Sequence, residues 1–142
     1  MITAQEALAR LKEGNARFVK NVNSDFATVI HNKRPELVET QAPLAIVLGC
    51  SDARVPAELV FDQGLGDLFV IRVAGNVVAP SGIGSVEFAA LSFGTPLVVV
   101  LGHSSCGAIS ATVDVLTGNS KIPSQNLHSI VKRIRPAVET LL

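Results

Sequence analysis

Both cysteines of this chain, together with one of its three histidines, lie directly after two apolar segments. Cys50 follows the run Leu44–Gly49, and a second run that ends at Gly102 is followed by His103 and, three residues later, by Cys106. Thiolate and imidazole groups are ligands that zinc prefers, and three protein ligands leave one tetrahedral position open, which is typical of a catalytic zinc site. The alternative is two buried cysteines and one hydrogen-bonded histidine, since free cysteine is among the most buried residue types.

An acidic and a basic residue stand two and four positions after the first cysteine. Asp52 can accept a hydrogen bond from a water or hydroxide on a metal, and Arg54 can keep that carboxylate ionised and correctly aimed. The same two residues could form an ordinary loop ion pair, which contributes less than ~1 kcal/mol. Charge and spacing alone leave both interpretations open.

Composition places the chain among globular proteins. Its 142 residues are 48% hydrophobic and 17% charged, which predicts a single domain over residues 1–142 with a buried core. Twelve basic residues balance twelve acidic ones, so no basic surface argues for nucleic acid or an anionic membrane as a partner. No apolar run approaches the ~20 residues of a membrane span. Two cysteines in a chain of this size do not make a disulfide framework, so we expect a cytoplasmic location.

The elements that must position these residues alternate between strands and helices. Short apolar runs, typical of strands buried on both faces of a parallel sheet, predict three strands: Leu44–Leu48, Leu68–Val73 and Leu97–Leu101. Helices are expected between and after them: Pro56–Phe61, Ser85–Ser92, Ala108–Leu116 and Ser124–Leu142, the last with a kink or interruption at Pro136. The fold class is therefore α/β, with a mainly parallel sheet flanked by helices.

The first 20 residues predict an N-terminal amphipathic helix arm. Thr3 and Glu6 form a capping box. Apolar residues follow at helical spacing: Ala7, Leu8, Leu11 and Phe18. Residues 21–42, which include His31, are polar and irregular, and we expect them to form a long solvated connection. A helix on such a connection can pack on its own domain or against a neighbouring subunit.

The chemistry-bearing residues all stand where predicted strands end. In open parallel sheets, ligands bind outside the carboxyl ends of the strands, so we expect Cys50 and His103 to lie close together. His103 and Cys106 are three residues apart, and a turn that opens into the following helix can aim both side chains inward.

Three short motifs taken together resemble those of the β-class carbonic anhydrases, and the absence of tyrosine points to the bacterial-type branch of that family. They are Cys-Ser-Asp-Ala-Arg-Val-Pro at 50–56, Ile-Arg-Val-Ala-Gly-Asn at 71–76 and Gly-His-Ser-Ser-Cys-Gly-Ala at 102–108. The resemblance runs from the N-terminal helix to about Leu116, in the family's order and at its spacing. Members of the family continue beyond a helix like the last one here into a further strand and helix, which this chain, ending at Leu142, is expected to lack.

This resemblance implies a role for each residue of the site. The ligands of one Zn²⁺ ion per chain would be Cys50, His103 and Cys106, and the catalytic dyad would be Asp52 and Arg54. The implied activity is the reversible hydration of CO2 to bicarbonate and a proton, by attack of zinc-bound hydroxide. Two thiolates cancel the formal charge of Zn²⁺, so we expect the pKa of the bound water to exceed the ~7 of a three-histidine site.

Two further roles implied by the resemblance concern the substrate and the assembly. Gln41 would approach bicarbonate from across a subunit interface, and Gly107 would offer its backbone N–H to the substrate. The working unit would then be a homodimer or a higher homo-oligomer. CO2 itself is small and apolar and needs a dry apolar wall, for which the candidates, each of which could equally be ordinary core, are Val55, Phe61, Val73 and Ala74.

Two other functions stay open from the sequence. The same fold and zinc site could hydrolyse CS2 or COS, because the shape of the access route decides the substrate. Zinc could also be a structural staple in a non-catalytic module, although a fourth thiolate or imidazole is missing and the Asp52–Arg54 pair is adjacent.

Overall fold

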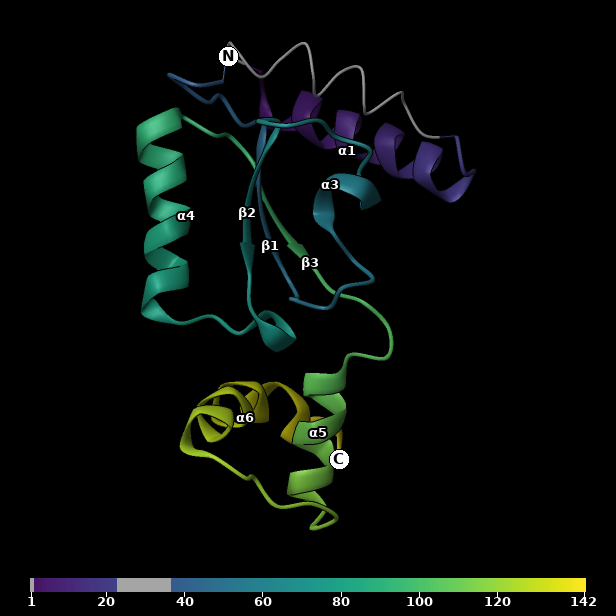
Figure 1. Ribbon diagram of the computed structural model, residues 1–142, viewed down its shortest axis with the longest axis vertical. Coiled ribbons are helices and arrows are strands. Elements are labelled where there is room, and N and C mark those ends of the chain that lie inside the picture. The colour runs from purple at the N-terminus through teal and green to yellow at the C-terminus, as the bar shows by residue number, and fades with distance from the viewer. Residues whose placement is uncertain (1, 23–36) are drawn as a thin grey trace.

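The centre of the molecule is a three-stranded parallel sheet, shown in Figure 1 as a computed structural model that describes residues 2–22 and 37–142. The strands β1 (Ala45–Gly49), β2 (Leu68–Arg72) and β3 (Val98–Leu101) lie in the order β2-β1-β3. Each prediction was correct to within one residue at either end, and the α/β fold class is confirmed. Residues 23–36, with His31 and most of the predicted connection, lie outside the described part.

The three strands differ in how deeply they are buried. Val47 of β1 pairs with Val70 on one side and Val99 on the other, and all five residues of β1 are buried. In β3, which is an edge strand, Val98 and Val100 are 48% and 67% exposed. The expectation of strands buried on both faces is therefore correct for β1 and wrong for β3, because no described element covers that face of the edge strand.

Helices cover both faces of the sheet and continue beyond its carboxyl end. In Figure 1, α4 lies on one side of the sheet, α1 and α3 lie on the other, and α5 and α6 stand below the strands. The helices are α1 (Ala4–Val19), α3 (Ala57–Val60), α4 (Pro80–Phe93), α5 (Gly107–Leu116) and α6 (Gln125–Val138), with 3-10 turns η1 (Ala74–Asn76) and η2 (Glu139–Leu141). Among the described residues, none of these helices is long and apolar enough to cross a membrane.

Two helices, α4 and α6, differ from their predicted bounds by more than one residue. Helix α4 begins at Pro80, five residues earlier than expected, because proline is well suited to the first turn, where its missing N–H is not needed. The helix ends before Gly94, which adopts the left-handed conformation with φ +64°. Pro136 lies inside the last turn of α6, which ends at Val138, and the chain then continues as η2, so the predicted interruption comes directly after the turn that contains the proline.

Helix α1 begins with the predicted capping box. The side chain of Thr3 accepts a hydrogen bond from the Glu6 backbone N–H (3.2 Å), and the Thr3 backbone N–H donates to the Glu6 carboxylate (2.7 Å). Two donors that helix formation would otherwise leave without partners are thereby satisfied.

The apolar stripe of α1 packs partly on the sheet of its own chain. Ala7 and Leu11 are buried in one cluster with Leu44 and Ala45 at the start of β1. The remaining apolar members of the stripe, Leu8 and Phe18, are 40% and 38% exposed. Ala7 and Leu11 therefore pack on their own domain, which is one of the two arrangements expected for this helix.

Helix α1 also lies unusually close to the turn that follows α3. A Cβ atom added to Gly14 would stand 1.8 Å from the backbone oxygen of Phe61, so only glycine allows this approach. One turn later, Arg17 forms an ion pair with the buried side chain of Asp62. These contacts join the amino-terminal helix to the body of the domain.

Candidate metal centre

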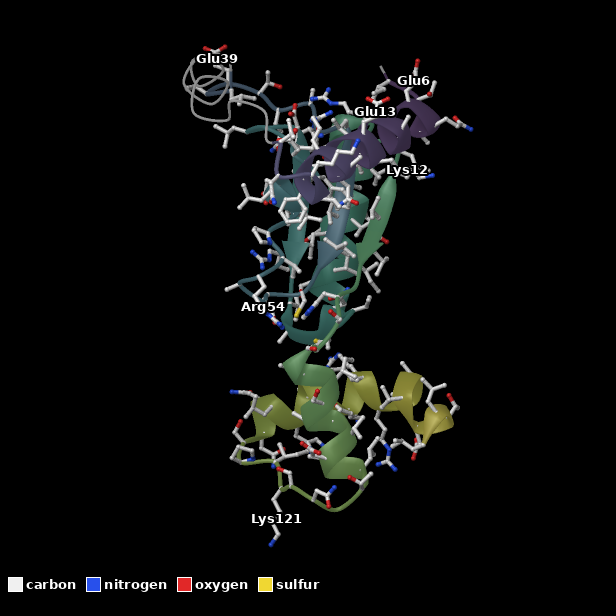
Figure 2. The ribbon with its side chains drawn as sticks, turned by 90° about the vertical axis from the view of Figure 1, so that its right-hand side faces the viewer. Glu6, Lys12, Glu13, Glu39, Arg54 and Lys121 are labelled. Atoms are coloured by element: carbon white, nitrogen blue, oxygen red, sulfur yellow. The ribbon has the colours of Figure 1, made fainter. Side chains whose placement is uncertain are left out.

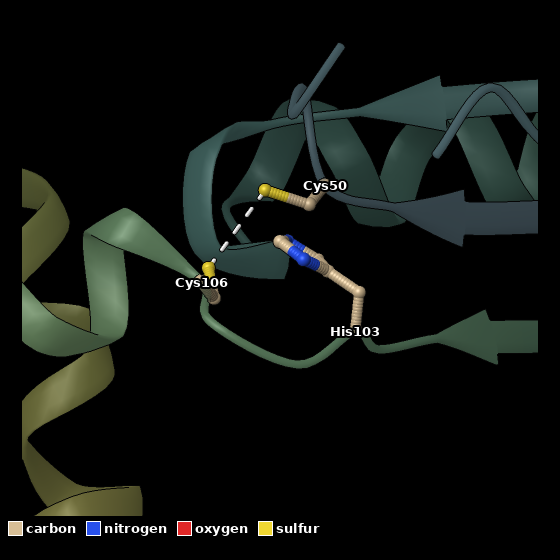
Figure 3. Close-up of side chains that lie close together, drawn as sticks. All are labelled: Cys50, His103 and Cys106. Carbon is tan, nitrogen blue, oxygen red and sulfur yellow. Dashed lines mark hydrogen bonds between the residues drawn. The ribbon is translucent and has the colours of Figure 1, made fainter. Parts of the chain in front are cut away.

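The loops that follow β1 and β3 bring the three predicted ligands together. Cys50 comes directly after β1, and His103 and Cys106 lie in the turn between β3 and α5 (Figure 3). Their ligand atoms all lie within 4.8 Å of one another, and the two sulfur atoms are 3.9 Å apart. The side chains therefore form a group that could hold a metal ion.

The His103 ring is oriented so that one nitrogen is free to act as a ligand. Its Nδ1 lies 2.9 Å from the backbone oxygen of Ser104, and this contact requires the proton to be on Nδ1. The other nitrogen, Nε2, is buried and has no hydrogen-bond partner among the described residues. A buried acceptor without a partner is destabilising, and a metal ion would satisfy it. Two sulfurs and one imidazole nitrogen are a donor set that fits zinc.

The surroundings of Cys50 favour the thiolate form that binds metals. Burial raises the pKa of its thiol, but the neighbouring His103 imidazole and the backbone N–H of Gly75, 3.3 Å from the sulfur, outweigh burial and lower the pKa to about 7. In return, Cys50 raises the pKa of His103. A thiol with a lowered pKa costs less free energy to deprotonate, so it binds a metal more readily at neutral pH.

Asp52 and Arg54 form a close pair beside this group. The Nε and Nη2 atoms of Arg54 donate to the two carboxylate oxygens of Asp52 at 2.9 and 2.7 Å, and the Arg54 backbone N–H donates to Oδ1 at 3.0 Å. These hydrogen bonds hold the pKa of Asp52 well below its usual range. Asp52 Oδ2 lies 3.9 Å from Nε2 of His103, so an ionised carboxylate faces the ligand group without contacting it.

Arg54 also connects the two ligand-bearing loops. Its Nη2 donates to the backbone oxygen of Ser105 at 3.1 Å, across from the loop that carries Cys50. Ser105 has φ +55°, a conformation that is uncommon for a residue other than glycine. An ordinary loop ion pair would join only its own neighbours, whereas this arginine holds Asp52 and the His103–Cys106 turn at once.

Gly107 and Gln41, the two predicted substrate contacts, lie at opposite ends of the sheet. Gly107 begins α5 directly after Cys106, and a Cβ atom there would meet no heavy atom within 4 Å. Gln41 precedes β1 and lines a hollow of about 520 Å³ together with residues that precede β2, among them Leu65. Figure 2 shows the same separation, because Glu39 lies near one end of the sheet and Arg54 at the other end, which faces α5. One chain therefore does not bring Gln41 to its own ligand group.

A cavity of about 170 Å³ adjoins the ligands. Its lining is mostly glycine backbone and ligand side chains: Gly75, Asn76, Gly102, His103, Cys106 and Ile109. Of the candidates for an apolar wall, Phe61 packs with the α1 cluster and Val73 with a cluster around Ile134. Ile109, which the sequence did not single out, is the apolar side chain that lines this cavity.

The sequence predicted no role for Arg72, Gly75 or Asn76 in the motif at 71–76, yet all three contact the ligand loops. Arg72 donates to two backbone oxygens of the Cys50 turn, the Gly75 N–H approaches the Cys50 sulfur, and Asn76 donates to the backbone oxygen of Leu101. The available signal was their place in the chain, since residues at the carboxyl end of β2 lie beside the carboxyl end of β1.

Comparison with known proteins agrees with this geometry. A family model described as carbonic anhydrase matches residues 45–142. A carbonic anhydrase of Mycolicibacterium smegmatis is 46% identical over 128 residues, which cover 90% of this chain and 61% of the relative. Carbonic anhydrase 2 of Mycobacterium tuberculosis is 42% identical over the same shares, so this chain spans 61% of the length of either relative.

Solved structures give the same result. The β-carbonic anhydrase CafA of the fungal pathogen Aspergillus fumigatus superposes with a TM-score of 0.67 at 29% identity, over 94% of this chain and 59% of CafA. A structure from a report on two tetrameric β-carbonic anhydrases of Sordaria macrospora has a TM-score of 0.66 at 25% identity, over 81% of this chain and 60% of that one. The resemblance drawn from the three motifs is thereby confirmed.

Proposed function

This chain belongs to the β-class carbonic anhydrase family, and from that premise we propose that it hydrates CO2 reversibly to bicarbonate and a proton with one bound zinc ion. The observation that carries the proposal is the group of Cys50, His103 and Cys106 with the ionised Asp52 beside it. Zinc would supply Lewis acidity, which lowers the pKa of a water molecule and makes hydroxide available at mild pH.

The role that we assign to Asp52 is to accept a hydrogen bond from the attacking water and so to orient its lone pair. Only an ionised carboxylate accepts with both oxygens, and Arg54 maintains that state by lowering the pKa of Asp52. The paired hydrogen bonds of Arg54 also restrain the carboxylate from moving onto the ligand group. The pair thus fixes both the charge and the direction of the acceptor.

Gly107 is assigned the contact with the substrate oxygen. The first N–H groups of a helix have no partner within the helix, and the positive end of the helix dipole favours the negative charge that forms as CO2 becomes bicarbonate. Because Gly107 starts α5 next to Cys106, its N–H is close to where this charge develops. The absence of a side chain leaves room for the substrate.

Gln41 is assigned to the site of a second copy of the chain, so the proposal includes a homodimer or higher homo-oligomer. Within one chain the β1 strand separates Gln41 from Cys50. Mixing two inactive variants tests this directly: dimers of a Gln41→Ala chain with an Asp52→Asn chain contain one intact site if Gln41 acts across the interface. Activity of the mixture well above that of either parent supports the assignment, and activity equal to their mean contradicts it.

A cytoplasmic location and a single domain over residues 1–142 are also part of the proposal. Cys50 and Cys106 are free thiols, and a reducing compartment keeps such residues available to a metal. The balanced charge of the chain gives no reason to expect a nucleic-acid partner.

The experiment that tests the proposed function is a stopped-flow assay of CO2 hydration on protein of measured zinc content, from pH 6 to 9. We expect one zinc per chain and a rate that rises toward alkaline pH, since two thiolates weaken the Lewis acid. A parallel assay for sulfide released from COS or CS2 separates the hydrolase alternative. A zinc-loaded chain without hydration at any pH would leave the structural alternative standing and overturn the proposal.

A further inference from the structure

The turn from Arg72 to Asn76 contacts both loops that carry the ligands, and it contributes no ligand itself. We propose that Arg72 and Asn76 are positioning residues, the first for the Cys50–Asp52 turn and the second for the loop that carries His103. Their effect on rate rests on the proposed hydration reaction, whereas their effect on loop geometry does not.

Beyond the carboxyl end of the sheet, side-chain hydrogen bonds from Arg72 replace the backbone hydrogen bonds between β1 and β2. The last backbone hydrogen bond between β1 and β2 runs from the Val73 N–H to the Gly49 oxygen (3.1 Å). Beyond it, Nε of Arg72 donates to the Cys50 oxygen (2.9 Å) and Nη2 donates to the Asp52 oxygen (2.6 Å). The rigid, planar fork of a guanidinium holds two acceptors in a fixed geometry, whereas the three donors of a lysine ammonium share one nitrogen and lack this fork.

These two hydrogen bonds fix the direction of the side chains in the turn. When the carbonyls of Cys50 and Asp52 both face Arg72, the peptide planes that follow Cys50 and Asp52 are set, and with them the directions of the Cys50 sulfur and the Asp52 carboxylate. Asp52 is thus held by two arginines, at its carbonyl by Arg72 and at its carboxylate by Arg54. Arg54 controls its charge, and Arg72 controls its place.

Asn76 performs the corresponding task for β3. Its Nδ2 donates to the backbone oxygen of Leu101 (2.8 Å), two residues before His103. Asn76 has φ +54°, and Gly75 before it has φ +68°. Asparagine and glycine tolerate this left-handed conformation best. Ile134 of α6 packs against this turn so closely that a Cβ atom on Gly75 would lie 2.6 Å from its Cδ1.

The first test replaces Arg72 with lysine, which keeps the charge and loses the fork. We expect kcat for CO2 hydration to fall at least about 10-fold, as for other partners that orient a metal site, with zinc content unchanged. In an Asp52→Asn background, the same replacement should change kcat less than about 2-fold, because Arg72 acts through Asp52. Arg135→Lys, on the exposed side of α6, is the matched control and should leave kcat unchanged.

A second readout does not depend on activity. The backbone N–H groups of Arg54 and Val55 both bond to Asp52, so in Arg72→Lys these amides should lose protection from hydrogen exchange while the amides of β1 keep theirs. If the wild type hydrates no CO2, the proposed function is overturned. Lost protection of these amides in Arg72→Lys would still support the positioning role of Arg72. Unchanged protection and unchanged kcat in an active protein overturn the role of Arg72.

Asn76→Gly tests the second contact without disturbing the turn, because glycine adopts positive φ freely. We expect a chelator to remove zinc about 10-fold faster, since a loosened His103 loop holds the metal less firmly. Asn119→Gly, in the exposed turn after α5, is the control and should release zinc at the wild-type rate. Equal release from Asn76→Gly and wild type overturns the role of Asn76.

Discussion

The two ends of the parallel sheet differ in what their contacts hold: at the amino end, apolar burial and the Arg17–Asp62 ion pair attach α1 to the domain, and at the carboxyl end, side-chain donors hold the ligand loops. At the amino end, Ala7 and Leu11 of α1 are buried against β1, and Gly14 touches the backbone of Phe61 with no space left. At the carboxyl end, backbone oxygens are held by side-chain donors from Arg54 and Arg72. Figure 2 places Arg54 at the end that faces α5 and α6, and Glu6 and Glu13 of α1 at the other.

The difference predicts how the two ends respond to substitution. Apolar burial contributes free energy in proportion to area but sets directions only coarsely, whereas hydrogen bonds contribute less free energy and set directions closely. Substitutions in α1 and its contacts at the amino end, as distinct from Gln41, should therefore lower the free energy of unfolding and leave activity per folded molecule unchanged. Substitutions at the carboxyl end should affect metal or rate, with smaller effects on unfolding of the metal-free chain.

Cys106→Ala should have the largest effect, at the carboxyl end. Removing one of three ligands should abolish zinc binding and with it detectable hydration, and it should lower the melting temperature of protein purified with zinc, since metal binding is coupled to folding. Metal analysis measures the bound zinc, the hydration assay measures the activity, and thermal unfolding measures the melting temperature. Ser104→Ala, in the same turn, keeps its backbone contact with His103 and is the control. Full zinc content in Cys106→Ala would remove that residue from the ligand set.

Gly14→Ala tests the amino end. The added Cβ would collide with the Phe61 oxygen, and forcing α1 away should lower the free energy of unfolding by about 1–3 kcal/mol, measured by urea denaturation. Gly84→Ala in α4 meets no atom within 4 Å and should instead raise it by about 0.5–1 kcal/mol. If Gly14→Ala lowered kcat without lowering stability, the separation of the two ends would be wrong.

Asp52→Asn, at the carboxyl end, should have a smaller effect than Cys106→Ala. Zinc content should stay at one per chain while the hydration rate falls at least about 10-fold, because the amide has one acceptor oxygen and an NH2 group that donates in place of the second. A stopped-flow comparison at equal zinc content measures the effect. A nearly normal rate would reduce Asp52 and Arg54 to a loop ion pair.

Glu6→Gln should have the smallest effect, at the amino end. Hydrogen bonds from the Thr3 backbone and then its side chain lower the pKa of Glu6 from its usual 4.5. A lowered folded-state pKa means that this stabilisation is present above pH 4.5 and is lost as the pH falls through the folded-state value. Wild type should therefore resist urea slightly better than Glu6→Gln at pH 7, with the difference vanishing in acid. A difference that does not depend on pH would contradict the assignment.

The sequence predicted most of the fold and the positions of the ligands because these depend on periodic burial and on residue type. The strand bounds were correct within one residue, and Cys50, His103 and Cys106 meet because parallel strands end at one edge. The exposure of Val98 and Val100 was not predicted, since an edge strand has the same apolar composition as a buried one.

The roles of Arg72 and Asn76 could not be read from the sequence for a different reason. Their partners are backbone oxygens, which every residue possesses, so no residue type marks the contact. The placement of Gln41 away from Cys50, by contrast, already follows from the predicted strand Leu44–Leu48, because Gln41 precedes this strand and Cys50 follows it.

The most direct test of the central claim is X-ray absorption at the zinc edge of the purified chain. The account predicts two sulfur ligands near ~2.3 Å, one histidine nitrogen at ~2.0–2.1 Å and one further light-atom ligand. A protein that contains no zinc, or in which Cys50 and Cys106 are joined by a disulfide, would contradict it.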